Sequence, residues 1–92
     1  MLLFTKPSNM AASRVIVPLS RVFDIYATDC SININYDSGE MVEVAGKFEK
    51  KIETVRVTFD SADEVDKIFR QFYKALNANS RAFYFGDSEK KN

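Results

Sequence analysis

The chain has 92 residues with 13 basic and 13 acidic side chains, so its formal net charge is zero. Apolar residues make up 46% of it and include eight Phe and four Tyr, which indicates one globular domain and excludes a disordered chain. Zero net charge gives the whole molecule no attraction to nucleic acid or anionic membranes, and without histidine the commonest general base and metal ligand is missing.

The charges are distributed unevenly along the chain. Residues 1–23 carry three bases and no acid, a net of +3. Residues 24–66 hold eleven acids and four bases, a net of −7, and residues 67–92 hold six bases and two acids, a net of +4. A fold that separates these regions can present a local basic patch that the net charge hides.

Residues 1–13 contain Pro7-Ser8-Asn9 and Ala11-Ala12-Ser13, and we expect them to form an arm with little structure of its own. The first apolar run is too short for a signal peptide, and Lys6 follows it instead of preceding it. No stretch has membrane-spanning length, and the single Cys30 allows no internal disulfide. We therefore expect a cytoplasmic protein without membrane contact.

Alternating apolar residues predict about five β-strands before any helix. The predicted strands cover, in order, 14–19, 23–27, 31–36, 42–44 and 54–59. Asp37-Ser38-Gly39-Glu40 has the composition of a hairpin turn, with Gly39 supplying a positive φ angle. Residues 47–51 are rich in charge and are predicted to be a connection.

One helix is predicted from Ser61 to Asn77. Ser61 and Glu64 fit a capping box at its start, and the acids that follow suit the positive end of the helix dipole. Apolar residues then recur at spacings of three and four, which predicts a core-facing arc centred on Ile68, Phe69 and Phe72.

The predicted fold class is therefore α+β. We expect an antiparallel β-meander of about five strands packed by one C-terminal amphipathic helix, with a short terminal strand at 81–85. Residues 14–85 would form the single domain, preceded by the N-terminal arm 1–13 and followed by a polar tail at 86–92.

The residue types give little support to catalysis. The three glycines form no phosphate-binding loop, and a zinc site needs several His or Cys ligands where this chain has one. Paired carboxylates remain possible on residue types alone. We predict a non-enzymatic protein with no catalytic residue, no metal and no cofactor.

Three groups of residues are candidates for ligand binding. Lys67, Arg70 and Lys74 form a basic stripe on the polar arc of the helix. The alternative for this stripe is a solvated face stabilised by pairs of opposite charge four residues apart. Asn33, Asn35 and Arg56 should line a polar sheet face near Tyr26, where a nucleotide-sized ligand could bind; the alternative is a sheet face covered by water.

The third group is Arg81 and Tyr84 in the segment Arg81-Ala-Phe-Tyr-Phe85. A cation among aromatic rings is the composition of a base-stacking platform, and the segment loosely resembles the aromatic strand of RNA-recognition domains. That fold needs two strand–helix–strand units, whereas here nearly all strands precede the only helix. The alternative is packing in the core, or pairing at a sheet edge that would produce a homo-oligomer.

Three segments carry a wider resemblance: residues 15–25, the strand at 31–36 and the helix start at 59–65. Their order resembles small phage-encoded and plasmid-encoded proteins with a meander-then-helix layout. The resemblance implies a phage accessory protein of the host cytoplasm, of anti-defence or host-interaction type.

Together these observations predict a non-enzymatic binding module. It would sequester a small anionic, nucleotide-like ligand or block a host protein, and would assemble as a homo-oligomer. The alternative is a single-stranded nucleic-acid-binding protein with the strands-then-helix layout of PC4-type or Whirly-type domains.

Overall fold

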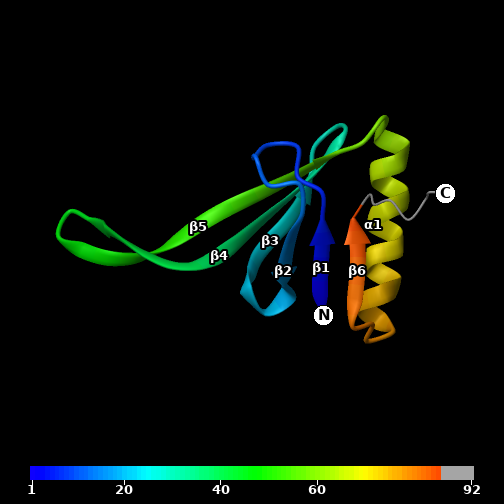
Figure 1. The fold of residues 1–92 in the computed structure, drawn as a ribbon. Helices are drawn as coiled ribbons and strands as arrows, with labels where there is room; N and C mark the ends of the chain where they lie inside the picture. The colour runs from blue at the N-terminus through cyan, green and yellow to red at the C-terminus, as the bar shows by residue number, and fades with distance from the viewer. Residues whose placement is uncertain (86–92) are drawn as a thin grey trace.

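A computed structural model describes residues 1–85 and has six strands and one α-helix arranged as two sheets (Figure 1). The terminal sheet has the order β2-β1-β6, and the hairpin sheet has the order β3-β4-β5. The elements are β1 Leu2–Thr5, β2 Val15–Pro18, a 3-10 turn Leu19–Arg21, β3 Val22–Ala27, β4 Ser31–Val44, β5 Lys47–Thr58, α1 Ala62–Asn77 and β6 Ala82–Phe85. The α+β class is confirmed, but the expected single meander of five strands is wrong.

The N-terminal segment was predicted to have little structure, and this is corrected for residues 2–5. They form β1, the central strand of the terminal sheet, which pairs antiparallel with β2 and parallel with β6. Leu3 is fully buried there. Four residues are too short a segment to show alternation clearly, so only the partners on both sides reveal this strand. The predicted tail at 86–92 lies outside the described residues.

The longest hairpin joins β4 and β5, and its turn is not where the sequence predicts it. Residues 37–40 lie inside β4 at an irregularity in the register, between the pairs Asp37–Ile52 and Met41–Lys50. Gly39 does have a positive φ of 86°, so its conformation is as expected, but it serves a bulge and not a turn. The chain reverses at Ala45 and Gly46, with φ of 52° and 80°. Alanine seldom adopts this conformation, which explains why the turn was not recognised.

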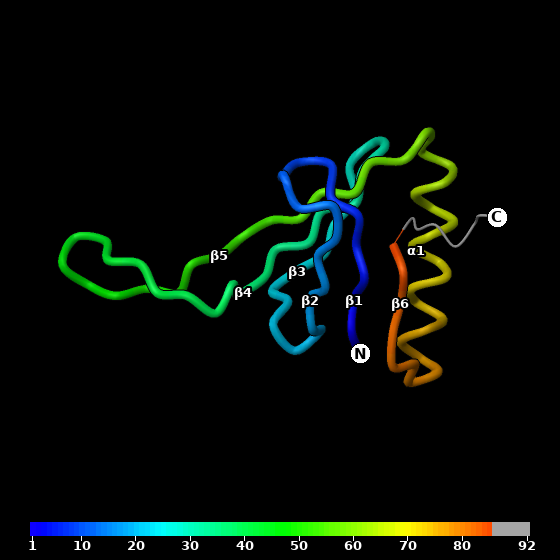
Figure 2. The backbone as a smooth tube through the Cα atoms, in the orientation of Figure 1, coloured from blue at the N-terminus to red at the C-terminus, as the bar shows by residue number. Residues whose placement is uncertain are grey.

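Residues 47–51, predicted to be a connection, form the first part of β5. The outer half of the hairpin, residues 38–51, extends away from the rest of the molecule, and we call it the arm (Figure 2). It accounts for the elongated shape, with principal extents of 48 × 27 × 22 Å. The arm has no core to pack on, so residues 47–51 are mostly charged even though their backbone forms a strand.

The helix begins and ends as predicted. Ser61 is the N-cap, and its hydroxyl accepts a hydrogen bond of 3.3 Å from the Glu64 amide. The Glu64 carboxylate accepts in return from the Asp60 amide at 3.0 Å. At the other end Asn79 has a φ of 55°, and the Ser80 amide donates to the Ala75 carbonyl, which closes the last turn.

One core joins both sheets and the helix. Its buried apolar side chains are Leu3, Val17, Ile32, Ile34, Val55, Val57, Val65, Phe72 and Phe85. The helix contacts β4 of one sheet and β6 of the other, so it packs across two sheets and not on one meander. None of the helices among residues 1–85 is long and apolar enough to cross a membrane.

Candidate interaction site

The outer side of the terminal sheet is lined only by apolar side chains. Register places Ile16, Phe4 and Tyr84 in one row across the three strands, and Pro18, Leu2 and Ala82 in the next. We call these six residues the apolar face. Leu2, Ile16 and Tyr84 are exposed, and the other three are half-buried. A contiguous apolar area on a sheet indicates an interaction surface better than scattered exposed apolar residues do, because leaving such an area in water costs free energy.

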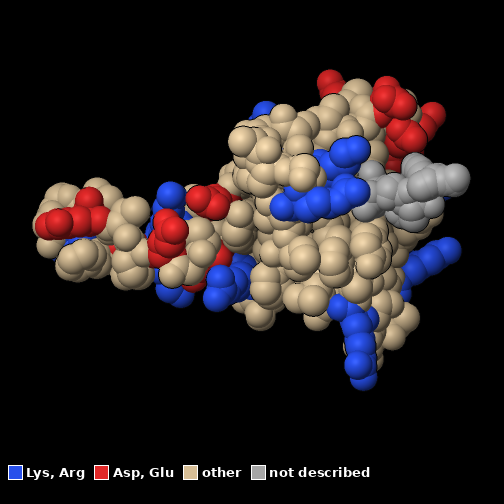
Figure 3. Space-filling view, viewed as in Figure 1, with Lys and Arg blue, Asp and Glu red and all other residues tan. Residues whose placement is uncertain are grey.

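Basic residues lie at both ends of the apolar face. Lys6 follows β1 and Arg14 precedes β2, which puts them at one end of this antiparallel pair. Arg81 precedes β6 at the other end, where its carbonyl accepts from the Leu2 amide at 2.8 Å. Residues 1–23 and 78–85 contain no acid. Figure 3 shows the result as an uncharged surface over β1, β2 and β6 with basic side chains at its margins, while acids gather near the helix start and side chains of both signs lie along the arm.

Alternation in β6 divides its aromatic residues between two environments. Tyr84 faces outward and stacks on Phe4, with ring centroids 4.6 Å apart and planes 19° apart. Phe83 and Phe85 face inward and pack on Phe72, at centroid distances of 5.3 and 5.1 Å. Of the two predicted site residues here, Tyr84 lies on the apolar face and Arg81 lies at its end.

The predicted polar residues of the hairpin sheet do come together. Tyr26, Asn33 and Arg56 form one row across β3, β4 and β5, and the Arg56 Nε donates to Asn33 Oδ1 at 2.9 Å. Asn33 is only 1% exposed, and its Nδ2 has no hydrogen-bond partner in the described part of the chain. The donor at this row is therefore closed off from solvent and does not present itself to a ligand on the surface.

The next row of the same sheet is satisfied internally. Asn35 Nδ2 donates to the Asp24 carboxylate at 2.7 Å, and Asn35 Oδ1 accepts a short hydrogen bond from the Thr54 hydroxyl. Asp24 also adds a negative charge beside the predicted site. This row therefore offers an anionic ligand little that is free to bind it.

The basic stripe of the helix lies partly on a shallow, open hollow. Its lining residues are Phe69, Arg70, Tyr73 and Lys74, and the hollow has a volume of about 370 Å³. Two of the three predicted cations, Arg70 and Lys74, contribute to it, and Lys67 is exposed without lining it. Tyr73 provides an exposed aromatic ring at the same place.

The predicted site residues therefore lie in three places: on the helix, on the hairpin sheet and on the terminal sheet. The apolar face was missed because it depends on β1, which the sequence pattern assigns to a weakly structured N-terminal segment, residues 1–13. The signal that could have found it is the alternation of Ile16 and Pro18 with Val15 and Val17, which leaves an apolar set on both sides of β2.

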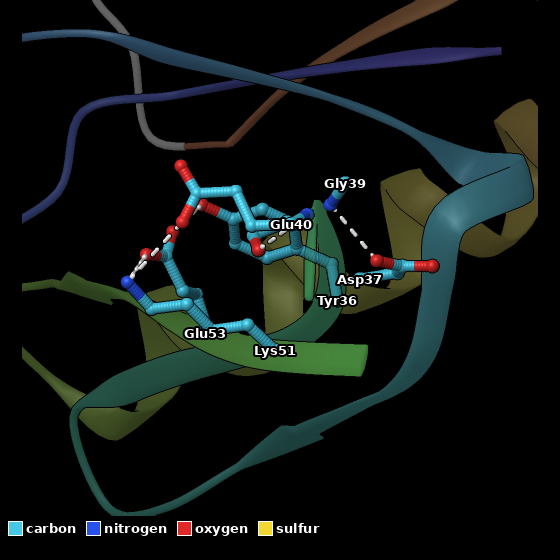
Figure 4. A network of polar contacts seen from close by, with 7 residues as sticks. Tyr36, Asp37, Gly39, Glu40, Lys51 and Glu53 are labelled. Atoms are coloured by element: carbon cyan, nitrogen blue, oxygen red, sulfur yellow. Dashed lines mark hydrogen bonds and ion pairs between the residues drawn. The ribbon is translucent and has the colours of Figure 1, made fainter. Parts of the chain in front are cut away.

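A polar network holds the base of the arm (Figure 4). Lys51 Nζ lies 3.5 Å from both the Glu40 and Glu53 carboxylates, and the Tyr36 hydroxyl donates to Glu53 Oε1 at 3.0 Å. Burial, together with this hydrogen bond, raises the pKa of Tyr36 above its usual 10.0. The Gly39 amide donates to Asp37 at 2.8 Å and lowers the pKa of that carboxyl below its usual 3.8, with further help from Lys50.

Residues 1–85 contain no cluster of three or more side chains suited to binding a metal ion. Comparisons of the chain with known protein families, with curated proteins and with solved structures found no match. The surfaces described above are therefore the basis for any functional assignment.

Proposed function

We propose that this protein is a non-enzymatic binding module that docks on another protein through the apolar face. The observation that carries the proposal is the row of Ile16, Phe4 and Tyr84 across three strands, with a second apolar row beside it. An apolar sheet face exposed to water is typical of an interaction surface.

The charges around this surface indicate the chemistry of the partner. Basic residues at both ends of the apolar face favour a protein whose own apolar patch is bordered by Asp and Glu. A second copy of this chain is disfavoured here, because it would bring two basic borders together. The partner is thus another protein, in agreement with the role of blocking a host protein that the phage resemblance implies. The phage origin itself rests on that resemblance alone.

Single-stranded nucleic acid is the main alternative for the same surface, since it also uses aromatic rings and basic residues. Four residues of the apolar face are aliphatic and offer no stacking surface: Leu2, Ile16, Pro18 and Ala82. The two rings, of Phe4 and Tyr84, stack on each other, so each already has one side covered. These features favour a protein partner.

Peptide display on the full chain tests the proposal. We expect a random peptide library to yield binders that combine apolar residues with Asp or Glu, because these match the apolar face and its basic borders. Ile16→Glu should weaken their binding at least tenfold. Val44→Glu is the matched control, since Val44 is a strand residue on the arm with 48% exposure against 53% for Ile16.

Two results would contradict the proposal. Selected peptides that bind Ile16→Glu as tightly as the wild type would show that the apolar face is not the docking surface. Oligothymidine that competes with the peptides, and whose affinity falls steeply with salt, would favour the nucleic-acid alternative.

A second candidate function is binding of a small anionic ligand at the hollow of the helix. The observation that favours it is the exposed ring of Tyr73, which lines the same hollow as the cations Arg70 and Lys74. A panel of cyclic and ADP-ribose-like nucleotides should then raise the melting temperature of the wild type, and Arg70→Glu combined with Lys74→Glu should abolish the shift. An unchanged melting temperature across the panel would count against this ligand class.

A further inference from the structure

The outer edge of β5 is occupied along one part of its length and open along the other. Next to the body of the protein, Ser8 N donates to the Arg56 carbonyl at 2.8 Å and Arg56 N donates to Asn9 Oδ1 at 3.0 Å. Asn9 Nδ2 also donates to the Thr54 carbonyl at 2.9 Å. The loop between β1 and β2 therefore covers the edge near 54–58. These contacts show that the backbone groups of Thr54 and Arg56 point away from β4. The extra residues at the register irregularity lie in β4, so the two-residue period of β5 continues and the same holds for its other even-numbered residues.

The open part of this edge is residues 47–53, which we call the free edge. In the described part of the chain, no hydrogen bond is made to the outward backbone groups of Phe48, Lys50 and Ile52. Phe48 is 71% exposed and Ile52 is 48% exposed, and both side chains lie on the same face of β5. Unpaired backbone groups beside exposed apolar side chains are the usual conditions for pairing with another strand.

We infer that the free edge pairs antiparallel with the free edge of a second copy, about a two-fold axis at Lys50. Two-fold symmetry requires residues of the same parity to face each other, so that both lie on one side of the joined sheet. Centred on Lys50, Phe48 lies opposite the partner's Ile52. On the other side of the sheet, Glu49 lies opposite the partner's Lys51, and Lys47 opposite the partner's Glu53.

Charge selects this register over its neighbours. Sliding one strand by two residues places Glu49 opposite either the partner's Glu49 or the partner's Glu53, and like charges directly opposite are destabilising. Sliding by four residues in one direction runs into the part of β5 that Ser8 and Asn9 cover. In the other direction it leaves only residues 47–49 paired, because β5 begins at Lys47. The register centred on Lys50 uses the whole free edge.

The one like-charged pair in this arrangement is Lys50 with its own copy at the axis. Lys50 Nζ lies 3.5 Å from Asp37 Oδ2 of its own chain, which offsets part of the repulsion. Met41 lies beside Lys50 on the same face, so the Lys50 stems and the apolar side chains of both arms would form one continuous strip. The apolar face is left uncovered, so this dimer and the proposed docking function are independent of each other.

Sedimentation velocity of the full chain tests the dimer, with Lys50→Pro and Lys50→Ala as a matched pair. Both variants remove the lysine, but proline also removes the outward N–H, which the β4–β5 ladder does not use. We expect a concentration-dependent dimer for the wild type and for Lys50→Ala, and at least a tenfold weaker dimer for Lys50→Pro. A wild type that stays monomeric, or equal association of the two variants, would overturn the inference.

Disulfide cross-linking tests the register. In a Cys30→Ser background, Lys50→Cys places two cysteines at the axis, at a separation that a disulfide can span. Mild oxidation should give a covalent dimer with Lys50→Cys and none with Glu53→Cys, whose copies would lie far apart. Cross-linking through Glu53→Cys, or none through Lys50→Cys, would show that this register is wrong.

Discussion

At the scale of single residues, the segment 37–40 shows that the same local sequence pattern can form either a hairpin turn or a β-bulge. Asp37, Ser38 and Gly39 have turn chemistry, and their hydrogen bonds are those of a turn: the Gly39 amide to Asp37 and the Glu40 amide to the Ser38 hydroxyl. In this chain they shape a bulge in the middle of a strand. Local chemistry determines the conformation of Gly39, whereas the pairing of the flanking residues determines whether the chain reverses there.

Gly39→Ala should lower the free energy of unfolding by roughly 1–2 kcal/mol, because an L-residue is strained at this φ. A Cβ at this position would also lie 2.9 Å from the Arg21 guanidinium, which would have to move. Gly46→Ala separates the two causes. Its φ is similar and no atom lies within 4 Å of the added Cβ, so it should show the backbone strain without the contact to Arg21. Urea denaturation measures both, and an unchanged midpoint for Gly39→Ala would contradict the expected strain.

Asp37 should make stability depend on pH in the acid range. Its pKa is lowered in the folded protein, so the contribution of its carboxylate is complete above pH 3.8 and is lost as pH falls through the folded value. Asp37→Asn removes this contribution. Urea midpoints measured between pH 5 and pH 2 should therefore fall less steeply for the variant than for the wild type, and parallel curves would argue against the lowered pKa.

At the scale of elements, the helix is the part that the sequence predicts best. Its cap, its apolar arc and its end all depend on neighbours within a few residues, and each is found where the pattern places it. The alternation of buried apolar and outward polar side chains in β4 and β5 is predicted equally well near the core, where Ile32, Ile34 and Val55 are buried. The arm is not predicted, because apolar and polar residues alternate along a strand only where one of its faces packs on a core.

Ser61→Ala should destabilise the protein by about 1 kcal/mol, because the Glu64 amide loses its acceptor at the start of the helix. Ser13→Ala, at an exposed loop position, is the control and should leave stability unchanged. Thermal and urea unfolding would measure the difference. Equal stability of the two variants would mean that the cap contributes little.

At the scale of the whole molecule, the core and the arm are separate in their energetics. The nine buried apolar residues found among residues 1–85 all lie outside the arm, at the inner parts of the sheets and on the helix. The two ion pairs of Lys51 at the base of the arm lie on the surface, where such pairs contribute little to stability. We therefore expect that folding does not need the arm.

Replacing residues 37–52 by Asn-Gly tests this separation. The two inserted residues would join Tyr36 directly to Glu53, which lie opposite each other with their backbone groups facing, the kind of pair that a two-residue hairpin loop closes. We expect the melting temperature of the monomer to change by less than about 5 °C, equivalent to roughly 1 kcal/mol in a small domain. The shortened chain should lose the dimer and retain peptide binding at the apolar face; loss of cooperative unfolding would contradict the separation.

Sequence pattern alone predicts the α+β class, the helix with its two ends, and the polar rows of the hairpin sheet. These features depend on local capping and on periodicity, both of which are written in consecutive residues. Tertiary contacts, in contrast, place Leu2–Thr5 between β2 and β6, give the terminal strands a sheet of their own, and continue β4 and β5 into an arm. Alternation shows which side a residue faces but not which strand lies beside it. The apolar face and the free edge both depend on those neighbours.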